Sequence, residues 1–214
     1  MEVKVLKDIL SANDQIAEKN RTLMDNNGAI AVNIMASPGA GKTSVIMQTI
    51  NRLKDKVRIG VIEGDISSSV DAETISKEGI PAIQINTGGG CHLDANMVSN
   101  ALPGLPLGEI DLIFIENVGN LICPAGYDLG DRKRVIICSI PEGDDKPIKY
   151  PVIFHNVDIV LLNKFDLLPY VKFDVYAFYK AVRNIKQNLK IIQLSCVTGQ
   201  GVDEWISWLK TQRG

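Results

Sequence analysis

The stretch AIAVNIMASPGAGKTS, residues 29–44, decides the fold. Its first half, AIAVNIMA (29–36), is a short apolar run, and its second half, ASPGAGKTS (36–44), is rich in small residues and opens directly into a helical pattern. A strand, a glycine loop and a helix in this order are the context in which a phosphate-binding loop is credible. Backbone N–H groups of such a loop curl around phosphates, and the helix N-terminus adds partial positive charge. The stretch therefore predicts a nucleotide-binding α/β domain.

Residue types within this loop suggest roles. Lys42 is expected to reach the β- and γ-phosphates, and the Thr43 hydroxyl is expected to ligate Mg²⁺. The strict pattern begins with glycine, but the chain has Ala36, whose methyl group narrows the permitted backbone angles. The alternative is an accidental glycine-rich turn, against which the flanking strand and helix argue. The remaining residues expected around the phosphates are Gly39, Ala40, Gly41 and Ser44.

Six more apolar runs follow the first, and helical patterns lie between several of them. We expect strands at 29–36, 57–64, 81–86, 110–117, 133–140, 157–163 and 190–195. We expect helices at 5–27, 42–54, 67–78, 94–101, 171–188 and 202–211. Buried strands that alternate with helices predict a mostly parallel sheet covered on both faces. Residues 102–108 and 141–151 are rich in Pro and Gly, and we expect them to be surface loops. We expect the chain to form one structural domain, in which an N-terminal helix (1–28) precedes the nucleotide-binding domain (29–214).

Composition narrows the class of protein. The chain has 214 residues, 45% of them hydrophobic, and a formal net charge of −2, which is ordinary for a folded domain and lacks the basic excess of a nucleic-acid or membrane binder. No signal peptide or membrane span is recognised, so we expect a cytoplasmic protein. Four cysteines are too few for a disulfide scaffold, so a functional cysteine is expected to act as a thiolate.

A guanine site is predicted from Asn163-Lys164-Phe165-Asp166, which follows the sixth expected strand. The carboxylate of Asp166 accepts hydrogen bonds from guanine N1–H and its exocyclic amine, a donor pair that adenine lacks. Ser195-Cys196 ends the last strand and is positioned to offer a backbone N–H to guanine O6, although a simple loop residue or helix cap is the alternative for Ser195.

Two carboxylates at strand ends are candidates for the catalytic centre. Asp65 ends the second strand and Glu116 ends the fourth, where they are expected to ligate Mg²⁺ with Thr43 or to position water. With Lys42 they form the expected catalytic set. Gly119, in ENVG, occupies the place of the DxxG glycine, whose N–H meets a γ-phosphate. A carboxylate that merely caps a turn or helix is the alternative for both acids.

Cysteine and histidine gather in two loops. Cys91 and His92 are adjacent after three glycines, and Cys123 lies 32 residues after Cys91 in ENVGNLICPAG. Thiolates and imidazole suit Zn²⁺ and Ni²⁺. Three ligands leave a tetrahedral site unfilled, so a second chain, water or an open position must complete it; isolated buried thiols or a structural zinc site are the alternatives. Cys138 is expected as a core thiol and His155 as a surface or packing residue.

These motifs together resemble a known family. ASPGAGKTS, IEGD, GGGCHLDA, ENVGNLICPA and NKFDLLPY are similar to the nickel-inserting GTPases of hydrogenase maturation, the HypB family. The resemblance covers nearly the whole chain, and the two cysteine-bearing motifs, GGGCHLDA and ENVGNLICPA, are highly specific. It implies a signal-recognition-type (SIMIBI) P-loop GTPase fold, GTP or GDP bound with Mg²⁺, a homodimer promoted by GTP, and Ni²⁺ or Zn²⁺ at the dimer interface.

The resemblance also assigns residues and partners. It implies that Cys91, His92 and Cys123 ligate the metal, and that Lys149 lies near the partner subunit's nucleotide. The implied partners are a HypA-type nickel-binding accessory chaperone and the precursor of the [NiFe]-hydrogenase large subunit, which receives the nickel. Residues 1–28 contain no Cys or His, so we expect no nickel-storage segment there.

Three alternatives differ in testable ways. A urease-type nickel GTPase (UreG) has the same fold but carries a Cys-Pro-His motif, whereas Cys91-His92 is contiguous and Cys123-Pro124 is followed by Ala125. A metal-binding dimer scaffold with little catalysis would have no need of the phosphate-loop residues. A small-molecule kinase shares the phosphate loop but does not require the guanine-selecting Asp166.

Overall fold

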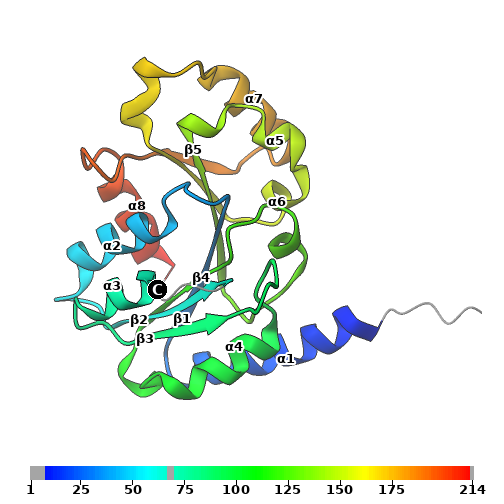
Figure 1. Cartoon of the computed structure of the whole chain (residues 1–214), viewed down its shortest axis with the longest axis vertical. Helices are drawn as coiled ribbons and strands as arrows, with labels where there is room; N and C mark the ends of the chain where they lie inside the picture. The colour runs from blue at the N-terminus through cyan, green and yellow to red at the C-terminus, as the bar shows by residue number, and fades with distance from the viewer. Residues whose placement is uncertain (1–7, 67–69, 213–214) are drawn as a thin grey trace, which may run out of the picture.

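The computed structural model describes residues 8–66 and 70–212, built around one seven-stranded sheet. The strand order is β3-β2-β4-β1-β5-β6-β7, and every neighbouring pair is parallel. The strands are β1 (Ile30–Ala36), β2 (Ile59–Asp65), β3 (Ala82–Asn86), β4 (Leu112–Glu116), β5 (Lys133–Ser139), β6 (Ile159–Asn163) and β7 (Lys190–Gln193). Figure 1 shows β1 inside the sheet, so the loop that follows β1 opens at the middle of the molecule.

Helices connect the parallel strands. The α-helices are α1 (Asp8–Asn26), α2 (Lys42–Leu53), α3 (Val70–Ser76), α4 (Ala95–Ala101), α5 (Lys146–Lys149), α6 (Pro151–His155), α7 (Val175–Ile185) and α8 (Val202–Thr211). Five short 3-10 helices complete the described chain: η1 (Leu102–Gly104), η2 (Leu107–Glu109), η3 (Cys123–Gly126), η4 (Ile140–Glu142) and η5 (Phe165–Tyr170). Among the described residues, no helix combines the length and the apolar character that a membrane crossing requires.

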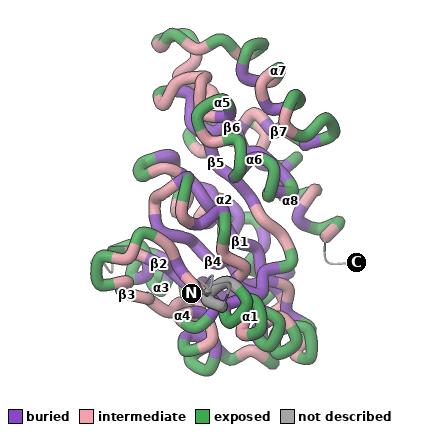
Figure 2. Tube along the Cα trace, turned by 90° about the vertical axis from the view of Figure 1, so that its right-hand side faces the viewer, coloured by how far each residue is buried: buried purple, intermediate pink, exposed green. Residues whose placement is uncertain are grey.

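Alternating side chains of the central strands build a core on each face. Val32 and Ile34 of β1 pack with α2, α3 and α8, whereas Ala31 and Met35 point to the opposite face. That opposite face is covered in two parts, by α1 and α4 near β2 and by α6 and α7 near β6. The central strands accordingly form the buried centre of the chain in Figure 2, whereas the edge strands β3 and β7 are more exposed. The predicted fold class, a mainly parallel sheet with helices on both faces, is confirmed.

The expected elements differ from the structure mainly at their ends and in two loops. Residues 102–108 and 141–151 were expected as plain surface loops, and this was wrong in detail: they contain short helices, and Leu102, Leu105 and Pro147 are buried. The helix expected at 171–188 is shorter, because the Asp174 side chain accepts a hydrogen bond from Ala177 N and starts α7 there. Residues 5–7 and 67–69 of two expected helices lie outside the described residues.

Candidate functional site

The phosphate loop has a conformation that its glycines permit. Gly39 and Gly41 have φ of +75° and +102°, in the region that side chains disfavour. A Cβ on Gly41 would lie 2.4 Å from Nδ2 of Asn163, so space also excludes a side chain. Ala36 is the buried last residue of β1, where strand backbone accepts alanine as well as glycine. The loop ends at Lys42, the first residue of α2.

Polar side chains meet just inside this loop. Lys42 Nζ lies 3.7 Å from Oε1 of Glu116, and the Thr43 hydroxyl donates to the same oxygen at 3.0 Å. The other oxygen of Glu116 is buried and has no hydrogen-bond partner among the described residues. Ser44, the next residue, is exposed. The structure therefore brings three of the expected phosphate and magnesium residues together.

Two further carboxylates lie here that the sequence analysis missed. Glu63 of β2 pairs in register with Glu116 of β4, and ligand oxygens of Glu63, Asp71 and Glu116 all lie within 4.8 Å of one another. Burial, followed by the charge of Glu116, raises the pKa of Glu63 to about 11. Burial also raises the pKa of Glu116, against the opposing charge of Lys42. The available signal was strand periodicity, because Glu63 stands two residues before Asp65 and shares its face.

Two expected site residues, Asp65 and Lys149, are not members of this group of three carboxylates. Asp65 ends β2 half-buried, and its backbone carbonyl accepts a hydrogen bond from Thr87 N at 2.9 Å, which ties it to the loop after β3. Lys149 is the exposed last residue of α5, and its Nζ lies 2.5 Å from a carboxylate oxygen of Asp145. Within one chain, therefore, Lys149 lies on the surface, outside the converging carboxylates.

The motif predicted to bind guanine is attached to the phosphate loop. Asn163 Nδ2 donates to the carbonyl of Ala40 at 2.9 Å, and Lys164 Nζ donates to the carbonyl of Gly39 at 2.7 Å. Lys164 adopts a left-handed backbone conformation with φ of +57°. These bonds fix the end of β6 against the loop that follows β1, so the base and phosphate regions are held as one unit.

Ser195 positions the carboxylate of Asp166. The Ser195 hydroxyl is fully buried and donates to Oδ1 of Asp166 at 2.6 Å. It also accepts from the backbone nitrogens of Val197 at 3.3 Å and Thr198 at 3.1 Å. Ser195 is thus a hydrogen-bond partner of Asp166 and also caps the turn at residues 197–198. Burial raises the pKa of neighbouring Cys196 to about 11, which keeps that side chain a thiol at neutral pH.

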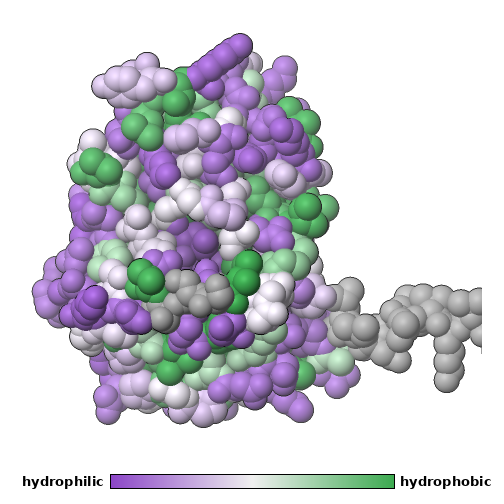
Figure 3. Space-filling view, in the orientation of Figure 1, coloured by the Kyte–Doolittle hydropathy of each residue, from purple (hydrophilic) through white to green (hydrophobic). Residues whose placement is uncertain are grey.

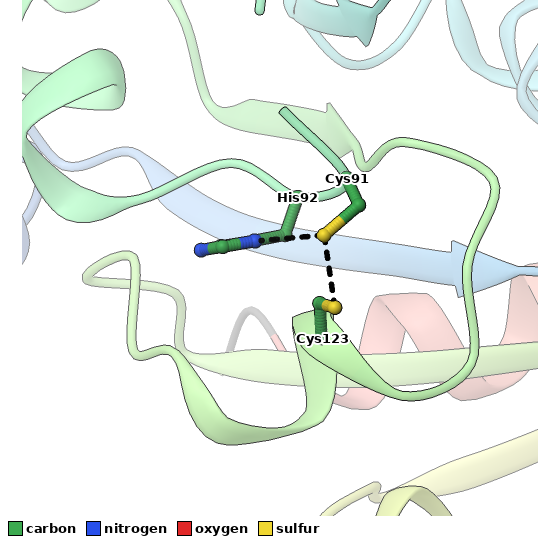
Figure 4. A group of neighbouring side chains, drawn as sticks. All are labelled: Cys91, His92 and Cys123. Atoms are coloured by element: carbon green, nitrogen blue, oxygen red, sulfur yellow. Dashed lines mark hydrogen bonds between the residues drawn. The ribbon is translucent and has the colours of Figure 1, made fainter. Parts of the chain in front are cut away.

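The predicted metal ligands converge from two loops. Cys91 and His92 precede α4, whereas Cys123 begins η3, and their side chains face one another in Figure 4. Cys91 Sγ lies 2.9 Å from Cys123 Sγ and 3.6 Å from His92 Nδ1. The pKa of Cys91 is raised, mainly by its hydrogen bond with the Cys123 thiol. Burial lowers the pKa of His92. A neutral imidazole beside two thiols is a donor set for Zn²⁺ or Ni²⁺.

The surroundings distinguish these ligands from the other Cys and His residues. The His92 ring packs on the ring of Tyr127, with centroids 4.0 Å apart. Cys138 is buried within β5, and burial raises its pKa, as expected for a core thiol. His155 is exposed at the end of α6, as expected for a surface residue.

Comparison with known proteins places the chain in a family. A protein-family model described as the CobW/HypB/UreG nucleotide-binding domain matches residues 30–193. The hydrogenase maturation factor HypB of Escherichia coli K12 is 47% identical over 213 residues, which cover 100% of this chain and 73% of that protein. The chain belongs to the HypB family of hydrogenase maturation factors. It thereby contains a nucleotide-binding domain of the SIMIBI type, and the resemblance inferred from the motifs is confirmed.

Solved HypB structures share the fold. HypB from Archaeoglobus fulgidus has a TM-score of 0.90 and 42% sequence identity, and the match covers 96% of this chain and 100% of that one. HypB from Helicobacter pylori, solved in complex with nickel, also has a TM-score of 0.90, with 33% identity, and the match covers 94% of this chain and 95% of that one. The fold thus agrees closely with two other members of the HypB family.

In this HypB-family chain one segment, residues 116–123, touches both sites. Its first residue, Glu116, bonds Thr43, and its last, Cys123, faces Cys91. Between them, Gly119 lies so close to Pro38 of the phosphate loop that a Cβ would come within 2.9 Å of the proline ring. The segment therefore rests directly on the phosphate loop.

Two asparagines of this connecting segment hold the loop of Cys91 and His92. Asn117 Oδ1 accepts from the backbone nitrogen of Leu93 at 3.1 Å. Asn120 Nδ2 donates to the carbonyl of Cys91 at 3.2 Å, while its Oδ1 accepts from Ile122 N at 2.9 Å. Asn120 thereby joins the backbone of one metal ligand to the residue that precedes another. The sequence does not predict the contacts of these side chains with Leu93 and Cys91, because those partners lie on another segment.

Proposed function

We propose that this HypB-family member is a GTP-hydrolysing metallochaperone that inserts nickel into the large subunit of [NiFe]-hydrogenase. We further propose that its GTP state is coupled to dimerisation and to metal binding. The observation that carries the proposal is the connecting segment, residues 116–123, which contributes Glu116 to the phosphate site and Cys123 to the thiol–imidazole cluster. A nucleotide-dependent shift of this segment would move one metal ligand relative to the other two.

The proposed nucleotide is GTP. Asp166, held by Ser195, presents its carboxylate for the guanine donor pair, and Asn163 and Lys164 fix the base site to the phosphate loop. Cys196 offers its backbone N–H to guanine O6 in this arrangement. Lys42 and the loop backbone bind the phosphates and stabilise the charge that develops during hydrolysis.

The oxygen donors beside the phosphate loop fit Mg²⁺. Thr43 and Glu116 already share a hydrogen bond, and the buried second oxygen of Glu116 lacks a partner among the described residues. Hydroxyl and carboxylate oxygens are the ligands that Mg²⁺ prefers. We assign Thr43, Glu116 and Asp65 to this ion, which when bound neutralises phosphate charge. Glu63 and Asp71 complete the carboxylate surroundings.

Nickel is proposed as cargo at the thiol–imidazole cluster. Cys91, His92 and Cys123 supply two sulfurs and one nitrogen, and the exposure of Cys91 leaves the cluster open to solvent. Zn²⁺ suits the same donors. Three ligands from one chain leave at least one position for a donor from a second copy, from an accessory chaperone of the HypA type, or from the large-subunit precursor. An open position suits delivery of a metal better than permanent storage.

An apolar surface beside Cys123 supports a homodimer. Ile122, Ile148 and Val152 expose 68%, 73% and 62% of their surface. Hydrophobic residues gather over α5 and α6 in Figure 3. A groove of about 300 Å³ lies there, lined by Leu121, Ile122, Lys149, Tyr150, Pro151, Val152 and Ile153. We propose that a second copy covers this surface, which would bring two metal clusters together and place Lys149 toward the partner's nucleotide.

Analytical ultracentrifugation of the full chain tests the proposed function. The protein is run with GDP, with a non-hydrolysable GTP analogue and with Ni²⁺ in turn. We expect the GTP analogue to shift the chain from monomer toward dimer, and Ni²⁺ to strengthen that shift. A chain that remains monomeric with both ligands, although each binds, would overturn the coupled-dimer proposal. A GTP turnover assay on the same sample separates a GTPase from a metal-binding scaffold.

A further inference from the structure

Helix α1 holds the two segments that carry the metal ligands. It lies along α4 on one face of the sheet, as Figures 1 and 2 both show. Its buried apolar residues among those described are Ala17 and Met24. Two buried asparagines lie on the same side of the helix, seven residues apart: Asn13 is 8% exposed and Asn20 is 2% exposed. Burying amides is costly unless they are hydrogen-bonded, so their partners matter.

Each asparagine bridges the same two segments. Asn13 Nδ2 donates to the carbonyl of Asp128 at 2.8 Å, and its Oδ1 accepts from the backbone nitrogen of Ala95 at 2.9 Å. Asn20 Nδ2 donates to the carbonyl of Ala95 at 2.8 Å and to that of Leu129 at 3.2 Å. Both polar groups of the Ala95 backbone are therefore bonded to α1, and the 128–129 backbone is bonded to the same two side chains.

The bridged residues stand next to the metal cluster. Ala95 is the first residue of α4, three residues after His92. Asp128 follows Tyr127, whose ring packs on His92, and comes five residues after Cys123. The 127–131 segment crosses α1 closely, since a Cβ on Gly130 would lie 2.6 Å from the carbonyl oxygen of Ala17. The contacts of α1 thus set the separation between the segment of Cys91 and His92 and the segment of Cys123.

We propose that Asn13 and Asn20 are positioning residues of the metal cluster, which hold His92 and Cys123 at ligating distance through the backbones of Ala95 and of residues 128–129. This inference rests on the proposed function, in which that cluster binds nickel. Apolar side chains at these positions would leave the N–H of Ala95 and the carbonyls of residues 128–129 without these partners, so the two amides both satisfy backbone groups and tie the two segments to each other. The amide hydrogen bonds fix the separation of two segments that follow different strands, β3 and β4.

The test measures metal affinity and metal geometry separately from stability. The full chain and its Asn13→Ala and Asn20→Ala variants are titrated with Ni²⁺ against a chelator, and with Co²⁺ to record the thiolate charge-transfer and d–d bands. The matched control is Met24→Ala, which removes a buried α1 side chain but leaves both asparagines in place. Guanine-nucleotide affinity is measured for every variant, and Cys123→Ala reports loss of a ligand.

Each asparagine variant should weaken Ni²⁺ binding about 3- to 30-fold and change the Co²⁺ bands, by analogy with lost hydrogen bonds around metal ligands. Met24→Ala should lower the melting temperature by at least as much while leaving affinity and bands unchanged. If Asn20→Ala does not fold, Asn13→Ala decides. Asparagine variants that bind metal as Met24→Ala does would overturn the positioning role. If the unaltered chain binds no Ni²⁺, or if Cys123→Ala binds it equally well, the proposed function fails instead.

Discussion

At the scale of single residues, candidate site residues are held in place by polar side chains of other segments. Ser195 holds Asp166, and Asn120 holds the backbone of Cys91. Sequence motifs predicted the residues that are held, Asp166 and Cys91, because both follow strands at recognisable spacings. They did not reveal the carboxylate partner Glu63 or the bridging Asn120, because such partnerships arise from strand register and loop packing rather than from local sequence.

The base specificity gives a direct prediction. Asp166→Asn should lose the preference for guanine and gain one for xanthine, because an amide presents a donor where the carboxylate accepted. Competition of GTP, ATP and XTP for the site, measured with a fluorescent nucleotide, checks this. Asp203→Asn, which alters an exposed carboxylate on α8, is the control and should leave the preference unchanged. Unaltered GTP affinity in Asp166→Asn would remove Asp166 from the base site.

The buried acid Glu63 should make stability depend on pH. Its pKa is raised to about 11 in the folded chain, whereas an unfolded glutamate titrates near about 4.3. Because the folded chain holds this proton more tightly than the unfolded chain, Glu63 contributes most to stability below the unfolded pKa. That contribution is lost as the pH rises toward the folded pKa. Glu63→Gln stays neutral, so its melting temperature relative to the unaltered chain should increase from pH 5 to pH 8.

Differential scanning calorimetry in EDTA without nucleotide measures this difference. Glu78→Gln provides a control, because Glu78 forms a surface ion pair with Lys54 outside the carboxylate cluster. A melting-temperature difference for Glu63→Gln that stays constant across the range would contradict the buried, protonated acid.

At the scale of elements, the strands were predictable and the short connections were not. Each expected strand overlaps an observed one, because continuous apolar runs bounded by polar or small residues are typical of parallel strands buried on both faces. The segments at 102–108 and 141–151 were harder to predict, since helices of three to five residues are too short to show a hydrophobic period. Their prolines favour loops in sequence reasoning, yet proline also begins α6.

The connecting segment, residues 116–123, should also limit catalysis. Asn120 follows Gly119 where a water-orienting Gln stands in some GTPases, and its amide is already bonded to Cys91 and Ile122. Without an arginine supplied by a partner, intrinsic GTP hydrolysis should be slow, well under ~1 s⁻¹. A phosphate-release assay on the purified chain measures it. Turnover at tens per second without partners would contradict this expectation.

At the scale of the whole molecule, the apolar surface over α5 and α6 should control self-association. Val152→Asp places a charge on this surface and should reduce dimer formation with a GTP analogue without changing GTP affinity, because the residue lies outside the nucleotide site. Sedimentation velocity checks it. Tyr176→Asp, at an exposed aromatic residue on α7, is the control. Equal dimerisation of Val152→Asp and the unaltered chain would place the interface elsewhere.

The central claim is that one segment couples the nucleotide to the metal. Coupling is reciprocal, so GTP and Ni²⁺ must change each other's affinity by the same factor, and typical couplings of ~1–3 kcal/mol correspond to about 5–150-fold. Asn120→Ala should reduce the factor, because it removes the bond between Cys91 and the connecting segment. Asn156→Ala, which frees the Ala125 carbonyl from α6 without touching residues 116–120, is the comparison.

The most direct test is the Ni²⁺ affinity of the full chain, measured by competition with a chelator in the presence of GDP and then of a non-hydrolysable GTP analogue. The coupling predicts different affinities in the two states and a difference that Cys123→Ala abolishes. Identical affinities with GDP and with the analogue would contradict it.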